Sequence, residues 1–118
     1  MNDINSLMKN IKYTFNDISN LNEALTHSSY DKNAKIQNYE RLEFLGDRVL
    51  GLIIASKLYM ENINSSEGDL AKKLSYLVCK STLKKVADRI ELGRYIKYSN
   101  KIDSLDSIKA NALEALIG

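Results

Sequence analysis

Apolar residues recur at helical spacing along most of this sequence. Near the start of the chain they stand three and four positions apart, as on one face of an amphipathic helix. The first predicted helices cover residues 4–11, a short segment behind Asn20, and a long segment from Asn38 to Asn62. A further helix is expected after Ser66, another after Ser81 that ends near Gly93, and a last one from about Ser104 to Gly118. No alternation typical of strands competes with this pattern, so we expect an all-α fold.

Polar stretches separate these predicted helices. Ser66 is followed three residues later by Asp69, which resembles a capping box at the start of a helix. Residues 28–37 and 97–104 are polar enough to be connections. The 118 residues contain no repeat and no internal domain boundary. They suffice for one compact domain, whose radius of gyration would be about 13 to 14 Å.

The overall composition gives little indication of a partner. Lys and Arg number 17 and Asp and Glu number 15, so the net charge of +2 does not by itself predict a polyanionic ligand. The single cysteine, Cys79, excludes a disulfide framework and is expected to be a small core residue. We expect the one histidine, His27, to be structural. Neither a signal peptide nor a membrane span is predicted, so we expect a soluble cytoplasmic protein.

Acidic side chains share one face of the long predicted helix. At roughly 100° per residue, Glu40, Glu43 and Asp47 fall within a sector of about 60°. Apolar residues continue this face one turn later, so at least Glu43 and Asp47 are expected at the edge of a packed surface. Carboxylates there lose hydration and repel one another unless a cation compensates. The alternative is an ordinary acidic first turn, neutralised by Arg41 or Arg48.

A further carboxylate, Glu114, is surrounded by apolar residues in the last predicted helix. A buried carboxylate must be protonated or matched by a positive charge. Asn111 lies one turn earlier on the same side. Hard oxygen donors from two helices suit Mg²⁺ or Mn²⁺, which would activate a water and polarise a phosphoryl oxygen. The alternative is a surface position for Glu114 beside Lys109.

Four segments together resemble one known family. ERLEFLGDRVL, residues 40–50, is similar to the signature of the ribonuclease III family, and ALTHSSY (24–30), EGDLAKKLSYLV (67–78) and ANALEALIG (110–118) resemble its other landmarks in the same order. The resemblance implies the helical-bundle endonuclease domain of that family. It further implies a homodimer that cleaves double-stranded RNA with Mg²⁺, or with Mn²⁺ as a substitute. The expected products carry 5′-phosphate and 3′-hydroxyl ends with short 3′ overhangs, and the expected task is processing of ribosomal and other structured RNA, including messenger RNA.

The resemblance also assigns roles to individual residues. Glu43, Asp47 and Glu114 match metal-binding carboxylates of the family, and Asp47 and Glu114 are expected to be catalytic. Asn111 stands where the family normally has Asp. Because its side chain keeps a carbonyl oxygen, we expect it to hold the metal through a bound water, with weaker metal affinity.

Other positions are expected to support this site. Glu40 and Glu67 match acidic residues that line the same valley. By resemblance, Phe44 belongs to the dimer contact, and core packing is the alternative. Gly46 costs a helix about 1 kcal/mol relative to Ala, so we expect it to permit the close approach of another element.

The family's domain continues past the segment ALEALIG, and most bacterial members then carry a double-stranded-RNA-binding domain. We therefore expect residues 1–118 to be an endonuclease domain that is truncated at its C-terminal end, with the RNA-binding domain absent from this chain. Asn111 and the early end leave a second hypothesis open, namely a catalytically impaired homologue that binds duplex RNA or acts as a scaffold. The lysines at positions 72, 73, 80, 84 and 85 fit either contacts to the RNA backbone or a solvated helix face.

Overall fold

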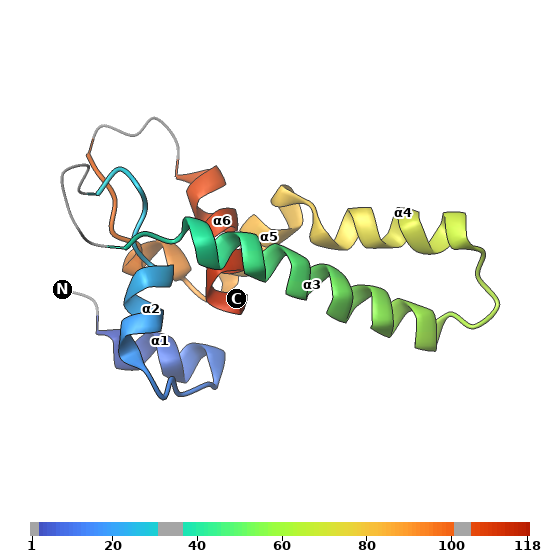
Figure 1. Cartoon of the computed structure of the whole chain (residues 1–118), viewed down its shortest axis with the longest axis horizontal. Coiled ribbons are helices and arrows are strands. Elements are labelled where there is room, and N and C mark those ends of the chain that lie inside the picture. Colours follow the sequence, from blue (N-terminus) through green and yellow to red (C-terminus); the bar gives the residue numbers. More distant parts are fainter. Residues whose placement is uncertain (1–2, 31–36, 101–104) are drawn as a thin grey trace.

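The structure, a computed structural model, describes residues 3–30, 37–100 and 105–118 (Figure 1). These residues form α1 (Ile4–Ile11), α2 (Ile18–Ala24), α3 (Glu40–Glu61), α4 (Glu67–Val78), α5 (Lys80–Arg89), the short 3₁₀ helix η1 (Leu92–Tyr95) and α6 (Asp106–Ile117). Within the described ranges, β-type pairing is limited to one isolated bridge between Thr26 and Lys97. The predicted all-α fold is confirmed. The expected loops at 28–37 and 97–104 lie partly outside the described residues.

Side-chain caps explain where two of the helices begin. The predicted cap at Ser66 is confirmed, because its Oγ accepts a hydrogen bond from the backbone N–H of Asp69 at 3.2 Å. The helix expected behind Asn20 begins earlier, at Ile18. There the carboxylate of Asp17 accepts the backbone N–H two residues further on at 2.9 Å, which satisfies a free donor of the first turn.

The buried core lies where α1, α2, α5, η1 and α6 meet. Its largest fully buried side chains are Leu7, Leu21, Leu25 and Leu92. Helix α6 runs through this core and packs against both α3 and α5. Half of the residues of α6 are buried, and one of them is the charged residue Glu114. The most deeply embedded helix therefore carries one of the predicted site residues.

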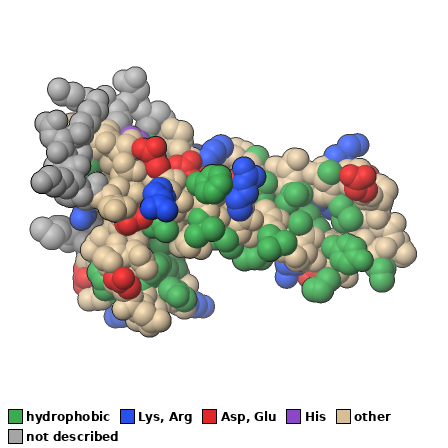
Figure 2. Space-filling model, in the orientation of Figure 1, with side chains coloured by type: hydrophobic (Ala, Val, Ile, Leu, Met, Phe, Trp, Pro, Cys, Tyr) green, Lys and Arg blue, Asp and Glu red, His purple; other side chains and the backbone are tan. Residues whose placement is uncertain are grey.

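Helices α3 and α4 form an arm that projects from this core (Figure 1). Only Gly46 is buried in α3, and no residue is buried in α4. The arm makes the molecule elongated, with extents of 50 × 30 × 24 Å and a radius of gyration of 15.5 Å. This radius exceeds the expected value because the arm has no core of its own. Figure 2 shows hydrophobic side chains gathered along it.

Cys79 lies at the junction between α4 and α5, and the expectation that it is a core residue is wrong. The side chain is only partly buried. Its Sγ lies 3.2 Å from the hydroxyl oxygens of Ser81 and Thr82. These hydrogen bonds lower the pKa of the thiol to about 7. Helix α5 begins directly after Cys79, at Lys80, two residues before the predicted start.

No helix in the described part of the chain is long and apolar enough to cross a bilayer.

Candidate functional site

The site is built where α3 crosses α6 at Gly46. A Cβ atom at this position would overlap the backbone carbonyl oxygen of Glu114 and would lie 2.9 Å from the backbone nitrogen of Gly118. Only glycine allows the two backbones to approach this closely. The predicted close approach at Gly46 is thus confirmed, and it sets the neighbouring α3 residues Glu43 and Asp47 beside α6.

The carboxylates of both helices line one pocket of about 370 Å³. Its lining residues are Glu40, Glu43, Phe44 and Asp47 from α3, Lys80 from the first position of α5, and Glu114 from α6. Four carboxylates therefore face a single ammonium group. This excess of negative charge makes the pocket a site for cations.

Glu114 is the buried member of this set. Its exposed fraction is 3%, which contradicts the alternative of a surface position beside Lys109. Lys109 instead donates to Asp88 at 2.9 Å. The cation that matches Glu114 is Lys80, whose Nζ donates to Oε1 of the carboxylate at 2.7 Å. The prediction that this carboxylate needs a compensating charge is confirmed, with a lysine as the partner in this structure.

The side chain of Asn111 joins the same network. Its Oδ1 accepts a hydrogen bond from the Nζ of Lys80. Its side chain also forms a hydrogen bond with the phenol of Tyr39. Burial raises the pKa of Tyr39 to about 12, which keeps the phenol protonated at neutral pH. Tyr39 and Lys80 therefore hold the side chain of Asn111 between them.

Burial also changes the acidity of two carboxyl groups. It raises the pKa of Glu43, where the nearby ammonium of Lys80 opposes the change and the charges of Glu40 and Asp47 add to it. It raises the pKa of Glu114 as well, and a hydrogen bond to Asp47 acts in the same direction while Lys80 again opposes it. Both groups are costly to ionise without a second cation.

Of the remaining predicted residues, two lie at the edge of the pocket and one lies far from it. Glu40 is exposed at the edge of the pocket, beside Phe44. Phe44 itself is 67% exposed, so core packing does not explain it, and Arg48 lies 5.7 Å from the centre of its ring. Glu67 begins α4 at the far end of the arm, in a groove that Tyr59 also lines. Within one chain, Glu67 is not brought to the pocket.

The donor chemistry of the pocket fits a hard divalent cation. Carboxylates from Glu43, Asp47 and Glu114 and the amide oxygen of Asn111 are the ligand types that Mg²⁺ and Mn²⁺ prefer. Among the described residues, however, no three acidic, histidine or cysteine side chains converge closely enough to hold a metal ion as they stand. In this structure the side-chain oxygens of Asn111 and Glu114 accept hydrogen bonds from the ammonium of Lys80 instead.

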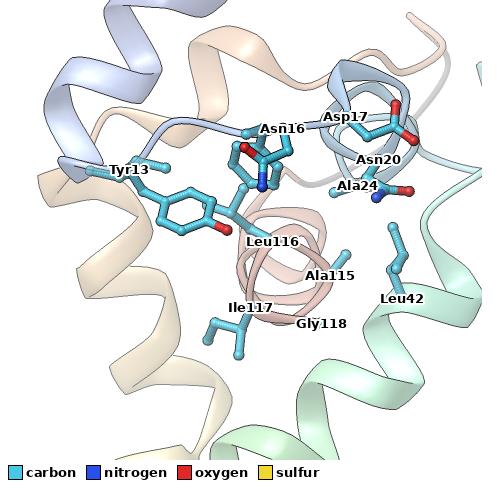
Figure 3. A pocket seen from close by; sticks show the side chains of 12 residues that line it. Tyr13, Asn16, Asp17, Asn20, Ala24, Leu42, Ala115, Leu116, Ile117 and Gly118 are labelled. Atoms are coloured by element: carbon cyan, nitrogen blue, oxygen red, sulfur yellow. The ribbon is translucent and has the colours of Figure 1, made fainter.

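A separate pocket lies against the last turn of α6 (Figure 3). The chain between α1 and α2, α2 itself and the start of α3 complete its walls, with side chains such as Tyr13, Asn20, Leu42 and Leu116. None of the predicted site residues lines it. The predicted carboxylates therefore gather at the crossing of α3 and α6 and not at this second pocket.

The fold and this pocket define an all-α domain with an acidic, oxygen-lined site. Residues 17–118 match the profile of the Ribonuclease-III-like family. The sequence is 45% identical to ribonuclease 3 of Clostridium tetani over 121 aligned positions, which cover 98% of this chain and 52% of that protein. It is 43% identical to ribonuclease 3 of Borreliella afzelii, over 98% of this chain and 50% of that protein. The chain thus spans about half the length of these relatives.

Solved structures agree with these sequence matches. The nuclease domain of ribonuclease III from Campylobacter jejuni superposes with a TM-score of 0.89 at 37% identity, covering 97% of this chain and 81% of that one. That structure is described for flexibility in a region involved in dimer formation. A second structure of the same nuclease domain gives a TM-score of 0.88. The chain therefore belongs to the ribonuclease III family.

Sequence patterns do not single out two residues of this network, Lys80 and Tyr39. Lys80 is one of five lysines that fit either contacts to the RNA backbone or a solvated helix face, and nothing in the sequence indicates the bond between Tyr39 and Asn111. The structure sets Lys80 apart by its place at the first position of α5, where the helix dipole disfavours a positive charge, whereas the sequence pattern places the start of this helix after Ser81. A lysine there points to a specific acidic partner.

Proposed function

We propose that this chain is the nuclease domain of an endoribonuclease that hydrolyses double-stranded RNA with Mg²⁺, for which Mn²⁺ can substitute. Its products carry 5′-phosphate and 3′-hydroxyl ends. The observation that carries the proposal is the convergence of Glu43 and Asp47 from α3 with Glu114 from α6 on one pocket. The family membership of the chain supports the same reaction.

The pocket residues have different proposed roles. Glu43, Asp47, Asn111 and Glu114 would hold the ion, which when bound supplies a polarised phosphoryl oxygen and an activated water. Glu114 is fixed by its burial in α6 and by the backbone contact at Gly46. Asp47 is exposed and hydrogen-bonded to the buried Glu114, so it would meet an incoming phosphodiester and accept a proton from water.

The substrate proposed for this site is an RNA duplex recognised by its A-form shape and phosphates more than by its sequence. The physiological role would be the processing of ribosomal and messenger RNA precursors in the bacterial cytoplasm.

We further propose that two copies of the chain associate through the arm of α3 and α4. Several large apolar side chains are more than half exposed there: Phe44, Leu52, Ile53, Tyr59, Met60, Ile63 and Tyr76. A patch of this kind on a chain of this size is typical of a protein interface. Light scattering should give a dimer for the wild-type chain and a larger monomer fraction for Phe44→Ala. A wild-type chain that is monomeric at every concentration would refute the association.

Association of two copies would also give Glu67 a role at the pocket of the partner chain. Because this residue lies at the far end of the arm, it can support the acidic pocket only when the partner's arm crosses the molecule. Mixing Glu43→Gln chains with Glu67→Gln chains should therefore restore part of the cleavage that each variant lacks alone.

The decisive experiment is cleavage of an end-labelled RNA duplex with purified protein and Mg²⁺. We expect cleavage by the wild-type chain, none in EDTA, and a loss of at least about 100-fold for Glu43→Gln. Glu91→Gln, between α5 and η1, removes an exposed carboxylate outside both the pocket and the arm and should cleave normally. Cleavage that persists in EDTA or in Glu43→Gln would contradict the proposal.

One observation favours a second candidate, a duplex-binding scaffold without turnover. The ammonium of Lys80 bonds the oxygens of both Asn111 and Glu114, which a metal would need. Equal duplex binding by the wild-type chain and Glu43→Gln, without cleavage by either, would support the scaffold. Cleavage gained by Asn111→Asp in the same assay would show that only the metal ligand is missing.

A further inference from the structure

Lys80 reaches from the first position of α5 into the acidic pocket. Its Nζ donates to Oε1 of Glu114 at 2.7 Å and also to Oδ1 of Asn111. The acceptor carboxylate is almost fully buried, with 4% of its side chain exposed, whereas the lysine side chain is 58% exposed. The ammonium thus closes the inner end of the pocket while its stem remains in solvent.

The other cations near the pocket do not match this arrangement. Arg48 lies 3.6 Å from Asp47, and both side chains are largely exposed, so this pair is weak. Lys84 pairs with Asp88 on its own helix. Lys80 is therefore the cation that compensates the buried carboxylate of Glu114.

The position of Lys80 in its helix is unfavourable for a cation. A positive charge at the start of a helix is repelled by the positive end of the helix dipole. No acidic residue of the first turn of α5 offsets this repulsion. The pairing with Glu114, 34 residues away in the sequence, gives the lysine a role that the local structure does not.

We propose that Lys80 is an exchangeable counter-ion of the acidic pocket, which holds Glu114 and Asn111 until a divalent cation displaces it. The inference rests on the proposed metal-dependent function of the same pocket. An ammonium and a divalent ion cannot both contact these two oxygens without strong repulsion at short range. A lysine has a flexible stem and a single charged head, so it can swing into solvent when it is displaced. Lys80 thereby sets the divalent ion concentration that the site requires, and it acts as a positioning residue.

This exchange predicts an order of affinities among variants at position 80. Lys80→Gln removes the competing charge and should bind Mn²⁺ about fivefold to tenfold more tightly than the wild-type chain. Lys80→Arg should bind it at least about threefold more weakly, because a guanidinium can bond Glu114 and Asn111 at once and leaves less readily. Lys85→Gln, on the exposed face of α5, loses the same charge away from the pocket and should bind like the wild-type chain.

Isothermal titration calorimetry with Mn²⁺ and no RNA measures these affinities directly, with circular dichroism to confirm folding. If Lys80→Gln does not fold, weaker binding by Lys80→Arg still supports the exchange, and equal or tighter binding overturns it. Equal or weaker binding by folded Lys80→Gln also overturns it. If no chain, including the wild type, binds Mn²⁺, both the exchange and the metal-dependent function fail. Binding that does not follow the predicted order defeats the exchange alone.

Discussion

The backbones of Gly46 and Glu114 are in direct contact at the point where α3 crosses α6. No side chain separates the two helices there, since a Cβ at position 46 would overlap the carbonyl oxygen of residue 114. This contact fixes the distance between the two halves of the acidic pocket, because Asp47 follows Gly46 directly and the side chain of Glu114 leaves the helix at the same level. Fold and site therefore depend on the same glycine.

Gly46→Ala should destabilise the protein strongly. The added methyl group meets a backbone carbonyl, which cannot move aside as a flexible side chain would, so the helices must separate. We expect a loss of at least about 3 kcal/mol in the free energy of unfolding, measured by urea denaturation.

Gly51→Ala is the matched control for this prediction. It lies in the same helix, and a Cβ at that position meets nothing within 4 Å. Alanine should stabilise the helix there by about 0.5 to 1 kcal/mol through its higher helix propensity. Equal effects of the two substitutions would mean that the contact at Gly46 does not hold α3 against α6.

Local patterns in the sequence were enough to predict the helices and half of the pocket. Apolar spacing predicted each α-helix, and the capping residue Ser66 predicted the start of α4, because both depend on residues that are close in sequence. The starts expected behind Asn20 and after Ser81 were wrong by a few residues. The burial of Glu114 followed from its apolar neighbours in α6. The close approach at Gly46 followed from the cost of a glycine inside a long helix.

Contacts between distant segments could not be predicted in this way. Lys80 is 34 residues from its partner Glu114, and nothing local distinguishes it from the neighbouring lysines except its place at the start of a helix. Cys79 is apolar in character and was expected in the core. Its actual position at a helix junction depends on how α4 and α5 meet, which is a tertiary property.

Tyr39→Phe should weaken metal use without abolishing it. The phenol is hydrogen-bonded to the side chain of Asn111, so we expect its removal to let the amide rotate and present its N–H groups to the pocket. We expect the Mg²⁺ concentration for half-maximal cleavage to rise about tenfold, with little change in the rate at saturating Mg²⁺. The loss of one partly buried hydrogen bond should also lower the free energy of unfolding by about 1 kcal/mol.

Tyr30→Phe provides the comparison for this substitution. Tyr30 is 48% exposed and lies outside the pocket, so the loss of its hydroxyl should change neither quantity. A Tyr39→Phe enzyme with an unchanged Mg²⁺ requirement would show that Asn111 keeps its orientation without the phenol.

The pocket carboxylates should make stability and metal binding respond to pH in opposite directions. Burial raises the pKa of Glu43 above its ordinary value of 4.5, so over the window above 4.5 the folded state binds more protons at this site than the unfolded state. The contribution of Glu43 to stability is therefore present below this window and is lost as the pH rises through it. Metal binding needs the ionised form and should strengthen over the same window.

This prediction is tested by urea denaturation of the wild-type chain and Glu43→Gln from about pH 4 to pH 7, without divalent ions. The variant has no carboxyl group to ionise at position 43. Its free energy of unfolding, relative to that of the wild-type chain, should therefore increase as the pH rises. Glu61→Gln, outside the pocket, should show no such trend. A constant difference between Glu43→Gln and the wild-type chain would contradict the raised pKa.

Asn111→Asp should tighten divalent binding while it destabilises the metal-free protein. The substitution adds a negative charge to a pocket where Glu43, Asp47 and Glu114 already repel one another, so the melting temperature without metal should fall. A fourth charged ligand raises the affinity for Mg²⁺, and we expect half-maximal cleavage at an ion concentration about tenfold lower. Because only the folded state binds the ion, added Mg²⁺ should raise the melting temperature of the variant more than that of the wild-type chain.

Asn5→Asp makes the same chemical change on the exposed face of α1, which does not line the pocket, and should leave the Mg²⁺ dependence as it is. The extra charge of Asn111→Asp also binds Lys80 more strongly, which opposes the gain in metal affinity. Adding Lys80→Gln to Asn111→Asp removes this opposition, so the double variant should need less Mg²⁺ than either single one. If Asn111→Asp alone leaves the Mg²⁺ requirement unchanged, then the side chain at position 111 does not contribute to holding the ion.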